Sequence, residues 1–297
     1  MFNKDQYYRK KLWVLLMFLP FFISCRTTRL FVSDPVEPTK YREKKIFEFL
    51  DIMNETSGLE FFDNRFWTFN DSGGEPLLYA FRPGSKDQDL QFYFTGLINI
   101  DWEDICADDS CIYIADIGNN AGWRDTLFIY RISYEGLLSG KNNFENIGFS
   151  FAEKTTDYSD CNPNPFDCEA LVALDDSLWI FTKNWQDQTS SVYKIPAKEG
   201  YYNISASERI DPAMLVTGAD YNQGDNTLWL IGYRHFVPVI CKYRITAGKL
   251  EKMEDITFWS RTGLQVEAIC TDDEGNIFFT NEKSIKRQAF WRLIPVD

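Results

Sequence analysis

The sequence repeats one short pattern five times between residue 57 and its end. Each repeat has an acidic or hydroxyl residue, an apolar segment, a turn rich in Asp, Asn and Gly, and a second apolar segment. The second segments read FWTFNDS (66–72), IYIADIG (112–118), LWIFTKN (178–184), LWLIGYR (228–234) and IFFTNEK (277–283). A third segment of the same kind follows each time. Short β-branched and aromatic segments separated by turn residues predict antiparallel strands.

The repeat length predicts how these strands assemble. The repeats start at Ser57, Glu103, Glu169, Asp220 and Glu267, at intervals of 46, 66, 51 and 47 residues. Intervals near this length are typical of the four-stranded blade of a β-propeller. We therefore predict an all-β, five-bladed β-propeller, with a six-bladed ring as the alternative. The last repeat has only three strands, and we expect residues 45–50 to supply the fourth and close the ring.

In a propeller the first strand of each blade lines the central axis. The first residues of the five repeats are therefore expected to lie together at one end of that axis. Converging carboxylates repel one another and favour a cation among them. Calcium fits best, since it takes about six to eight oxygen ligands, whereas zinc and copper favour His and Cys. The predicted metal ligands are Ser57, Glu103, Glu169, Asp220 and Glu267. The alternative is that these side chains bond to backbone amides and hold the blades in register.

The ends of the second strands surround this ring on the same face. The candidate ligand-binding residues are Asn70, Asp71, Asn119, Asn184, Tyr233, Asn281 and Glu282. The candidate catalytic residues are Glu103, Asp116, Lys183 and Arg234. The two cations could receive an anionic group, and either carboxylate could be the general base for a metal-activated water. Simple salt bridges are the alternative, and no complete catalytic set is readable. If the protein is an enzyme, we expect a metal-dependent hydrolase.

Several segments resemble uncharacterised secreted bacterial β-propeller lipoproteins over nearly the whole domain. They are DWEDI (101–105), DIGNNAGWRDTLFIYRI (116–132), DCEAL (167–171), FTKNW (181–185), TGADYN (217–222) and VEAI (266–269). One acidic or hydroxyl residue per blade also resembles the calcium-activated nucleotidases (apyrases), five-bladed propellers with an axial calcium held by Ser and Glu. Asp220 departs from that pattern, and the nucleotide-binding residues do not match. Phytase-like and lactonase-like propellers have the same axial arrangement, which implies a phosphoester or lactone hydrolase as one alternative.

Aromatic residues near the loop ends suggest a different class of function. Trp102, Trp123 and Trp185 could stack on a sugar ring. The protein would then be a binding module for a small molecule, a glycan or a protein, with calcium in a structural role. A purely structural role in the envelope is the third hypothesis.

The first 25 residues predict export and lipid anchoring. Lys4, Arg9, Lys10 and Lys11 precede an apolar run (12–23), as in a signal peptide. Ile23-Ser24-Cys25 resembles a bacterial lipobox, in which the cysteine is acylated. We predict a lipoprotein signal peptide over 1–24, an anchor and tether over 25–43, and the propeller over 44–297. Acylated Cys25 would anchor the protein in the bilayer of the bacterial cell envelope, with the outer membrane as the expected location, facing the periplasm or the cell surface.

Cysteine usage and net charge complete the expectations. An even number of cysteines after Cys25 in an exported protein favours disulfides. The expected pairs are Cys106–Cys111, Cys161–Cys168 and Cys241–Cys270. The formal net charge of -13 argues against nucleic acid as a partner, because phosphates would be repelled.

Overall fold

A computed structural model describes residues 40–85, 88–154 and 164–296. The predicted signal peptide, Cys25, most of the tether and Cys161 lie outside the described residues. The described segments belong to one compact unit, Thr39–Asp297. Within them, no helix is long and apolar enough to cross a membrane.

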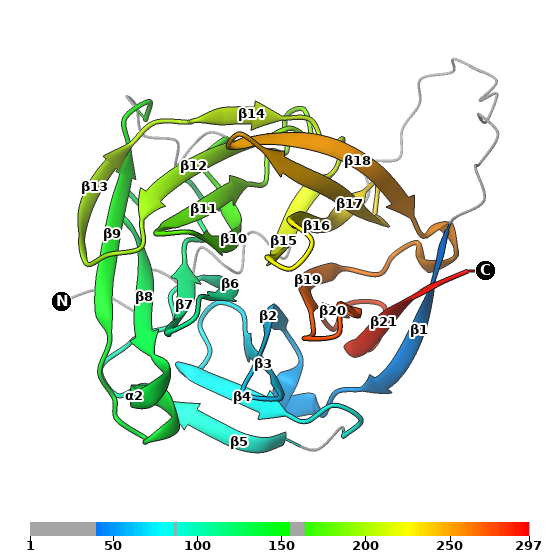
Figure 1. Ribbon diagram of the computed structural model, residues 1–297, viewed down its shortest axis with the longest axis horizontal. Helices are drawn as coiled ribbons and strands as arrows, with labels where there is room; N and C mark the ends of the chain where they lie inside the picture. The colour runs from blue at the N-terminus through cyan, green and yellow to red at the C-terminus, as the bar shows by residue number, and fades with distance from the viewer. Residues whose placement is uncertain (1–39, 86–87, 155–163, 297) are drawn as a thin grey trace. The chain divides into compact units, whose positions relative to one another are not determined.

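The described residues form five sheets arranged around a central axis (Figure 1). The innermost strands are β2, β6, β10, β15 and β19. Each of these strands contacts the inner strand of the next blade, so the five make a closed ring. The prediction of a five-bladed propeller is confirmed, and the six-bladed alternative was wrong.

The first two blades carry the chain from residue 56 to residue 151. Blade 1 contains β2 (Thr56–Phe62), β3 (Arg65–Asn70), β4 (Leu77–Phe81) and β5 (Gln88–Tyr93). It is preceded by a 3-10 turn, η1 (Asp51–Met53). Blade 2 contains β6 (Trp102–Ala107), β7 (Cys111–Asp116), β8 (Leu127–Ser133) and β9 (Glu145–Phe151). The short helix α2 (Tyr134–Leu138) follows β8, and the Ser133 hydroxyl caps it by accepting from the Gly136 N–H.

The remaining blades repeat this order. Blade 3 contains β10 (Cys168–Leu174), β11 (Ser177–Thr182), β12 (Ser190–Pro196) and β14 (Glu208–Ile210). Blade 4 contains β15 (Leu215–Asn222), β16 (Thr227–Arg234), β17 (Val237–Thr246) and β18 (Lys249–Thr257). After η2 (Trp259–Arg261), blade 5 contains β19 (Val266–Thr271), β20 (Ile277–Asn281) and β21 (Ala289–Pro295).

One strand crosses from blade 3 to blade 2. After β12, strand β13 (Gly200–Ile204) pairs in parallel with β9 at the outer edge of blade 2, and the chain then returns to blade 3 as β14. The Tyr201 ring packs over Gly148 on β9, where a Cβ would come within 2.6 Å of the ring. This exchange fastens two neighbouring blades together.

The ring closes through the predicted segment ahead of the first repeat. Strand β1 (Tyr41–Glu48) pairs antiparallel with β21, from Tyr41 opposite Pro295 to Glu48 opposite Ala289. Figure 1 shows these strands side by side, β1 in blue and β21 in red. The strand begins at Tyr41, so its first residues fall within the segment predicted as tether.

The core lies between blades rather than within one sheet. Each of five hydrophobic clusters combines side chains from two neighbouring blades. Between blades 5 and 1, for example, Phe66 packs edge-on against Phe278 and Phe290, with ring centroids 4.7 and 4.8 Å apart. Burying rings on both faces of a sheet explains the aromatic enrichment of the strands.

The disulfide prediction was wrong for the described cysteines. Cys106, Cys111, Cys168, Cys241 and Cys270 are buried free thiols. The register places Cys106 opposite Tyr113, which makes Cys111 a diagonal neighbour. Diagonal Cα atoms are about 7–8 Å apart, beyond the usual reach of a disulfide at about 4.4–6.8 Å. Cys241 packs between blades 3 and 4, and Cys270 between blades 5 and 1, so the third expected pair is separated by a blade interface.

Candidate metal centre

Each inner strand carries a β-bulge near its start. The pairing shifts by one residue at Gly58, Glu103, Glu169, Thr217 and Glu267. A bulge re-aims the inserted side chain, and here three of the five inserted residues are glutamates. We call this end of the propeller, where the inner strands begin, the acidic face.

Two predicted metal ligands take other roles. Ser57 precedes the bulge of blade 1, and its hydroxyl donates to the Glu103 carbonyl of blade 2 at 2.6 Å. In blade 4 the bulge falls on Thr217, whose hydroxyl donates to the Val266 carbonyl at 2.8 Å. Asp220 lies three residues further along β15, opposite Trp229. The expectation that Asp220 joins the ring of Glu103, Glu169 and Glu267 was therefore a misalignment of the repeat.

Backbone hydrogen bonds bring a second set of residues to the acidic face. In blades 2, 3 and 5 the carbonyl of the residue two before the bulge accepts from an N–H just after the second strand, and in blade 1 the carbonyl of the residue three before the bulge does so. This occurs as Asp71 to Glu55, Gly118 to Asp101, Lys183 to Asp167 and Glu282 to Gln265, at 2.8–3.1 Å. The repeated geometry sets Asp101 beside Glu103 and Asp167 beside Glu169. It also makes Gly118 the equivalent of Asp71, Lys183 and Glu282.

Three carboxylates on this face converge as ligands of one cation could. Oxygen atoms of Asp71, Asp101 and Glu103 all lie within 4.8 Å of one another. Oxygen ligands of calcium lie about 2.3–2.6 Å from the ion, so two ligands on opposite sides are about 5 Å apart. Asp71 and Asp101 are partly exposed, so solvent reaches the group.

Gly118 provides the space for this convergence. A Cβ at Gly118 would overlap both a Glu103 carboxylate oxygen and the Asp101 carboxylate. The corresponding positions of blades 1, 3 and 5 bear Asp71, Lys183 and Glu282, whereas in blade 2 the missing side chain leaves room for two carboxylates. The loop that follows is held by a buried ion pair between Arg124 and Asp116 at 2.7 Å.

Negative charge is concentrated on the acidic face. Burial raises the pKa of Glu103 well above its ordinary value, and Glu169, Asp71 and Asp101 raise it further. Burial likewise raises the pKa of Asp101 to about 6, against the lowering effect of Arg124. The pKa values of Asp71, Asp167, Glu267 and Glu282 are also raised, in each case first by burial. A bound cation would offset this repulsion.

One buried lysine lies among the carboxylates of the acidic face. The Lys183 ammonium lies 3.1 Å from Glu169, and both side chains are buried. Burial alone would lower the pKa of Lys183, but Glu169, Tyr233 and Glu267 outweigh it and raise the pKa well above its ordinary value. Lys183 is therefore a fixed positive charge, paired with one of the predicted metal ligands.

Asp167 has an oxygen atom without a partner. Its Oδ1 accepts from the Asn119 N–H at 2.9 Å, whereas its buried Oδ2 has no hydrogen-bond partner among the described residues. Burial and the neighbouring Glu169 raise the pKa of Asp167. A buried acceptor left unpaired is costly, so this carboxyl group has unused capacity for a proton or a cation beside the cluster.

The predicted ligand-binding asparagines hold loops on this face. Asn70 donates to the Ile52 carbonyl at 2.7 Å, and Asn119 donates to Arg124 at 3.2 Å. Asn184 accepts from the Gln186 N–H at 2.9 Å, and Asn281 donates to the carbonyls of Glu282 and Arg287, both at 2.9 Å. Their side-chain amides are thus used to shape the loops around the acidic face.

Two predicted catalytic residues are committed to structure. Asp116 is fully buried and accepts from Arg124, from the Tyr130 hydroxyl at 3.1 Å and from the Asp101 N–H at 3.2 Å. The Arg234 guanidinium donates to the Ala213 carbonyl in the loop before β15. Of the other two predicted catalytic residues, Glu103 belongs to the converging carboxylates and Lys183 is paired with Glu169.

Sequence reasoning missed Asp101, Asp167 and Gly118. The available signal was the pattern Asp-x-Glu, which occurs as Asp101-Trp-Glu103 in blade 2 and as Asp167-Cys-Glu169 in blade 3. The two acids are two residues apart, the spacing at which side chains of an extended chain share a face, and in both blades the second acid is the bulge residue. Of the three predicted tryptophans, Trp102 is buried in the core, whereas Trp123 and Trp185 are exposed.

A second acidic group lies further along the axis. Asp104 accepts from the backbone N–H of Leu171 in blade 3 at 2.8 Å, and from that of Ala219 in blade 4 at 3.2 Å. Its carboxylate therefore crosses the axis and ties three inner strands together. Burial raises the pKa of Asp220 to about 7. Burial also raises the pKa of Glu60 well above its ordinary value, and the neighbouring Asp220 and Asp104 raise it further. Asp220 belongs to this inner group.

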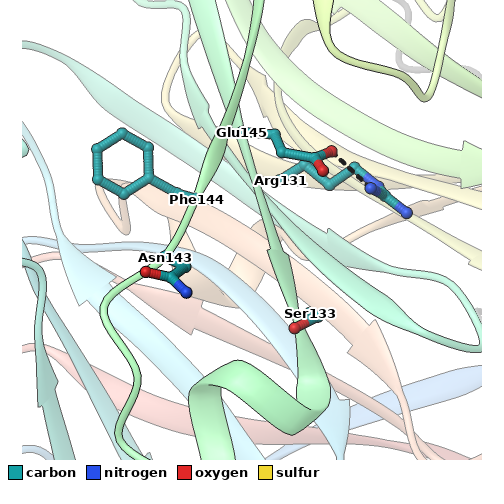
Figure 2. Close-up of a pocket in the computed structure, with 5 residues that line it drawn as sticks. All are labelled: Arg131, Ser133, Asn143, Phe144 and Glu145. Atoms are coloured by element: carbon teal, nitrogen blue, oxygen red, sulfur yellow. Dashed lines mark hydrogen bonds and ion pairs between the residues drawn. The ribbon is translucent and has the colours of Figure 1, made fainter.

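The described residues also line a small pocket of about 130 Å³ at the outer edge of blade 2. Figure 2 shows its lining, with Arg131 and Glu145 paired at 2.6 Å and Ser133, Asn143 and Phe144 around them. These residues lie on β8, β9 and the segment between them, far along their sheet from the inner strand β6. The pocket is separate from the acidic face.

Comparison with known proteins supports the fold. No protein-family profile and no curated protein matches the sequence. Among solved structures, the apo-form aldose sugar dehydrogenase of Escherichia coli is similar over 86% of this chain and 100% of its own, with 11% identity and a TM-score of 0.51. A gluconolactonase of Xanthomonas campestris is similar over 86% of this chain and 90% of its own, with 12% identity and a TM-score of 0.46. At 11% identity the likeness to the dehydrogenase shows the fold alone, that of a β-propeller.

Proposed function

We propose that the protein is an envelope lipoprotein whose propeller binds a divalent cation, calcium, on the acidic face, and a ligand beside it. The observation that carries the cation site is the convergence of Asp71, Asp101 and Glu103 over Gly118. The unpartnered Asp167 oxygen supports it independently. Carboxylate oxygens are the ligands that calcium prefers.

The test is calcium titration of the protein stripped with EDTA, followed by thermal unfolding and by calorimetry. A ligand that binds only the native state stabilises it by about 2.7 kcal/mol at a concentration of 100 times its Kd. We expect calcium to raise the Tm of the wild type and of Gly74→Ala. Asp101→Asn should abolish the rise, because it removes a ligand charge.

Gly118→Ala is the sharper variant, since its Cβ would displace two carboxylates without changing any charge. We expect it to weaken calcium binding about 10- to 100-fold, the usual effect of disturbing the groups that orient metal ligands. Gly74→Ala is the matched control on the same face, because a Cβ there meets nothing closer than 3.6 Å. Equal calcium responses of the two variants would refute the site.

The alternative function is a calcium-dependent hydrolase of a phosphoester or lactone. The observation in its favour is Lys183, a buried cation beside the carboxylates that could stabilise a developing anion. Hydrolysis of p-nitrophenyl phosphate and of δ-gluconolactone, with calcium and with EDTA, tests it. Calcium-dependent turnover that Lys183→Met removes would establish the hydrolase, and its absence would leave the binding function.

Lipid anchoring rests on the Lys-rich and apolar N-terminal sequence and on Cys25. We expect the chain to incorporate radiolabelled palmitate when it is expressed in a bacterium that processes lipoproteins, and to sediment with membranes. Cys25→Ser should lose both properties. A soluble, unlabelled wild-type protein would contradict the anchoring.

A further inference from the structure

Three aromatic side chains gather beside Lys183 on the acidic face. Tyr233 is buried, its ring stacks on Phe236 with centroids 5.8 Å apart and planes 7° apart, and Trp185 packs edge-on against it at 6.4 Å. Trp185 and Phe236 are 41% and 47% exposed. We call Trp185, Tyr233 and Phe236 the aromatic platform.

The backbone beneath Phe236 adopts a conformation that disfavours this residue. Arg234 pairs with Val237, so His235 and Phe236 form a two-residue hairpin turn with φ of 50° and 60°. Such turns favour Asn-Gly, because both residues need positive φ, and a bulky residue there is a genuine outlier. The loop before β19 holds the turn, since the Gly263 N–H donates to the Phe236 carbonyl at 2.7 Å. Strain of this kind is characteristic of ligand clamps.

Packing does not explain the strained aromatic residue. Nearly half of the Phe236 side chain faces solvent, so the fold gains little from burying it. A smaller residue would suit the turn better and would expose less apolar surface. The position is instead suited to presenting a ring at the acidic face, stacked on Tyr233.

The surroundings restrict what can stack there. Carboxylates dominate the acidic face, and they accept hydrogen bonds, so an anion is disfavoured and hydroxyl donors are favoured. The Lys183 ammonium already lies 5.6 Å from the Trp185 ring and 5.7 Å from the Tyr233 ring, so a second cation at the platform would be repelled. What remains is a neutral ligand with an apolar ring face and several hydroxyl donors.

We propose that the aromatic platform binds a neutral pyranose, with its C–H face stacked on Phe236 and its edge against Trp185, and with its hydroxyl groups directed to the partly exposed carboxylate of Glu267 and other carboxylates of the acidic face. The proposal deepens the proposed function and rests on it in placing ligand and cation on the same face. The stacking surface itself does not require the cation.

The experiment uses the folded propeller with methyl glucopyranoside, methyl galactopyranoside, methyl mannopyranoside and methyl N-acetylglucosaminide, observed by saturation-transfer NMR and tryptophan fluorescence. Sorbitol supplies hydroxyl groups without a ring, and choline supplies an organic cation. We expect at least one pyranoside to bind and sorbitol and choline not to bind. Binding of no pyranoside, or equal binding of sorbitol or choline, would overturn the proposal.

Variants separate the platform from the fold. Phe236→Gly relieves the turn, so we expect an unchanged or higher Tm with at least tenfold weaker pyranoside binding, whereas Phe236→Tyr should keep the binding. His235→Asn, at the other position of the same turn, and Tyr201→Ala, an exposed ring on β13, are matched controls that should bind normally. A Phe236→Gly protein that is destabilised but binds normally would show that the ring serves packing.

Failure of the cation site is distinguishable from failure of the platform. Pyranoside binding is measured in EDTA and in calcium, and calcium binding is measured without sugar. Binding of sugar in EDTA with no calcium response would reject the cation site and keep the platform. A calcium response without sugar binding would reject the platform as a sugar site and keep the cation site.

Discussion

The ammonium of Lys183 lies 3.1 Å from the carboxylate of Glu169, and the two side chains are almost completely removed from solvent. This pair places one fixed positive charge within the carboxylates of the acidic face. The contribution of this ion pair to stability depends on whether another cation also neutralises those carboxylates. Substituting Lys183 therefore tests for the proposed calcium.

Lys183→Met should therefore have opposite effects on stability and on calcium binding. Removing one partner of a buried pair costs about 3–5 kcal/mol, so we expect that loss in denaturant titrations in EDTA. Calcium should bind more tightly and recover most of the loss, because it no longer meets a neighbouring cation. Lys194→Met, which removes a lysine stacked on Trp179 outside the site, is the control. Equal destabilisation with and without calcium would contradict the prediction.

Asp104→Ala should be among the most destabilising single changes in the inner strands. The variant leaves the N–H groups of Leu171, Ala219 and Ile105 without their acceptor. Each buried unpaired group costs about 1–3 kcal/mol. Asp104→Asn keeps one carbonyl oxygen and should lose less, and urea unfolding of the two variants measures the difference. A loss no larger for Ala than for Asn would show that these bonds contribute little.

The stability of the metal-free protein should fall as the pH rises from about 4 to 7. Burial raises the pKa of Asp220 to about 7, whereas an unfolded Asp titrates near pH 3.9. Between these values the unfolded chain releases its proton first, so the free energy of unfolding decreases with pH and levels off above 7. Asp220→Asn cannot ionise and should reduce this slope.

Urea unfolding at pH 5, 6, 7 and 8 measures the slope, with Asp109→Asn as control. Asp109 lies exposed in the turn after β6, away from Asp220, so its substitution should leave the slope unchanged. A slope identical in wild type and Asp220→Asn would mean that other carboxyl groups account for it.

Reducing agents should not change the stability of the propeller. The described cysteines are buried free thiols, and burial raises the pKa values of Cys106, Cys168 and Cys270 well above the ordinary range. Thiolates are the reactive form, so native protein should be alkylated at these positions only after denaturation. Peptide mapping by mass spectrometry, with and without urea, locates the labelled residues. A Tm lowered by dithiothreitol would contradict the free-thiol assignment.

The repeat pattern was sufficient to predict the blades, because strand composition and turn residues recur at a regular interval. Closure by the segment ahead of Ser57 followed from counting strands. The site was harder to predict, because a β-bulge changes which side chain faces the axis and no composition signal marks it. Thus Thr217, and not Asp220, occupies the ring position in blade 4.

Other misses arise from three-dimensional placement that sequence spacing does not reveal. Asp101 lies just before its strand, so strand composition does not mark it, and its carboxylate meets that of Asp71 from another blade only in the folded ring. The cysteine pairs failed because strand register and blade assignment, rather than sequence spacing, determine which sulfur atoms meet. The residue types in the sequence were therefore sufficient to predict an acidic site. Which side chains meet there depends on strand register, which only the structure shows.

The pairing of β1 with β21 means that the ring cannot close until synthesis reaches β21. Strand β1 is the first strand of the propeller to be synthesised, but its partner β21 is the last strand of the ring to be made. It must wait unpaired while four blades form, and an unpaired strand invites association with other chains. Its sequence, Tyr-Arg-Glu-Lys-Lys-Ile-Phe-Glu, is mostly charged. The same charges that leave β1 a solvated edge in the finished ring thus keep it soluble until the ring can close.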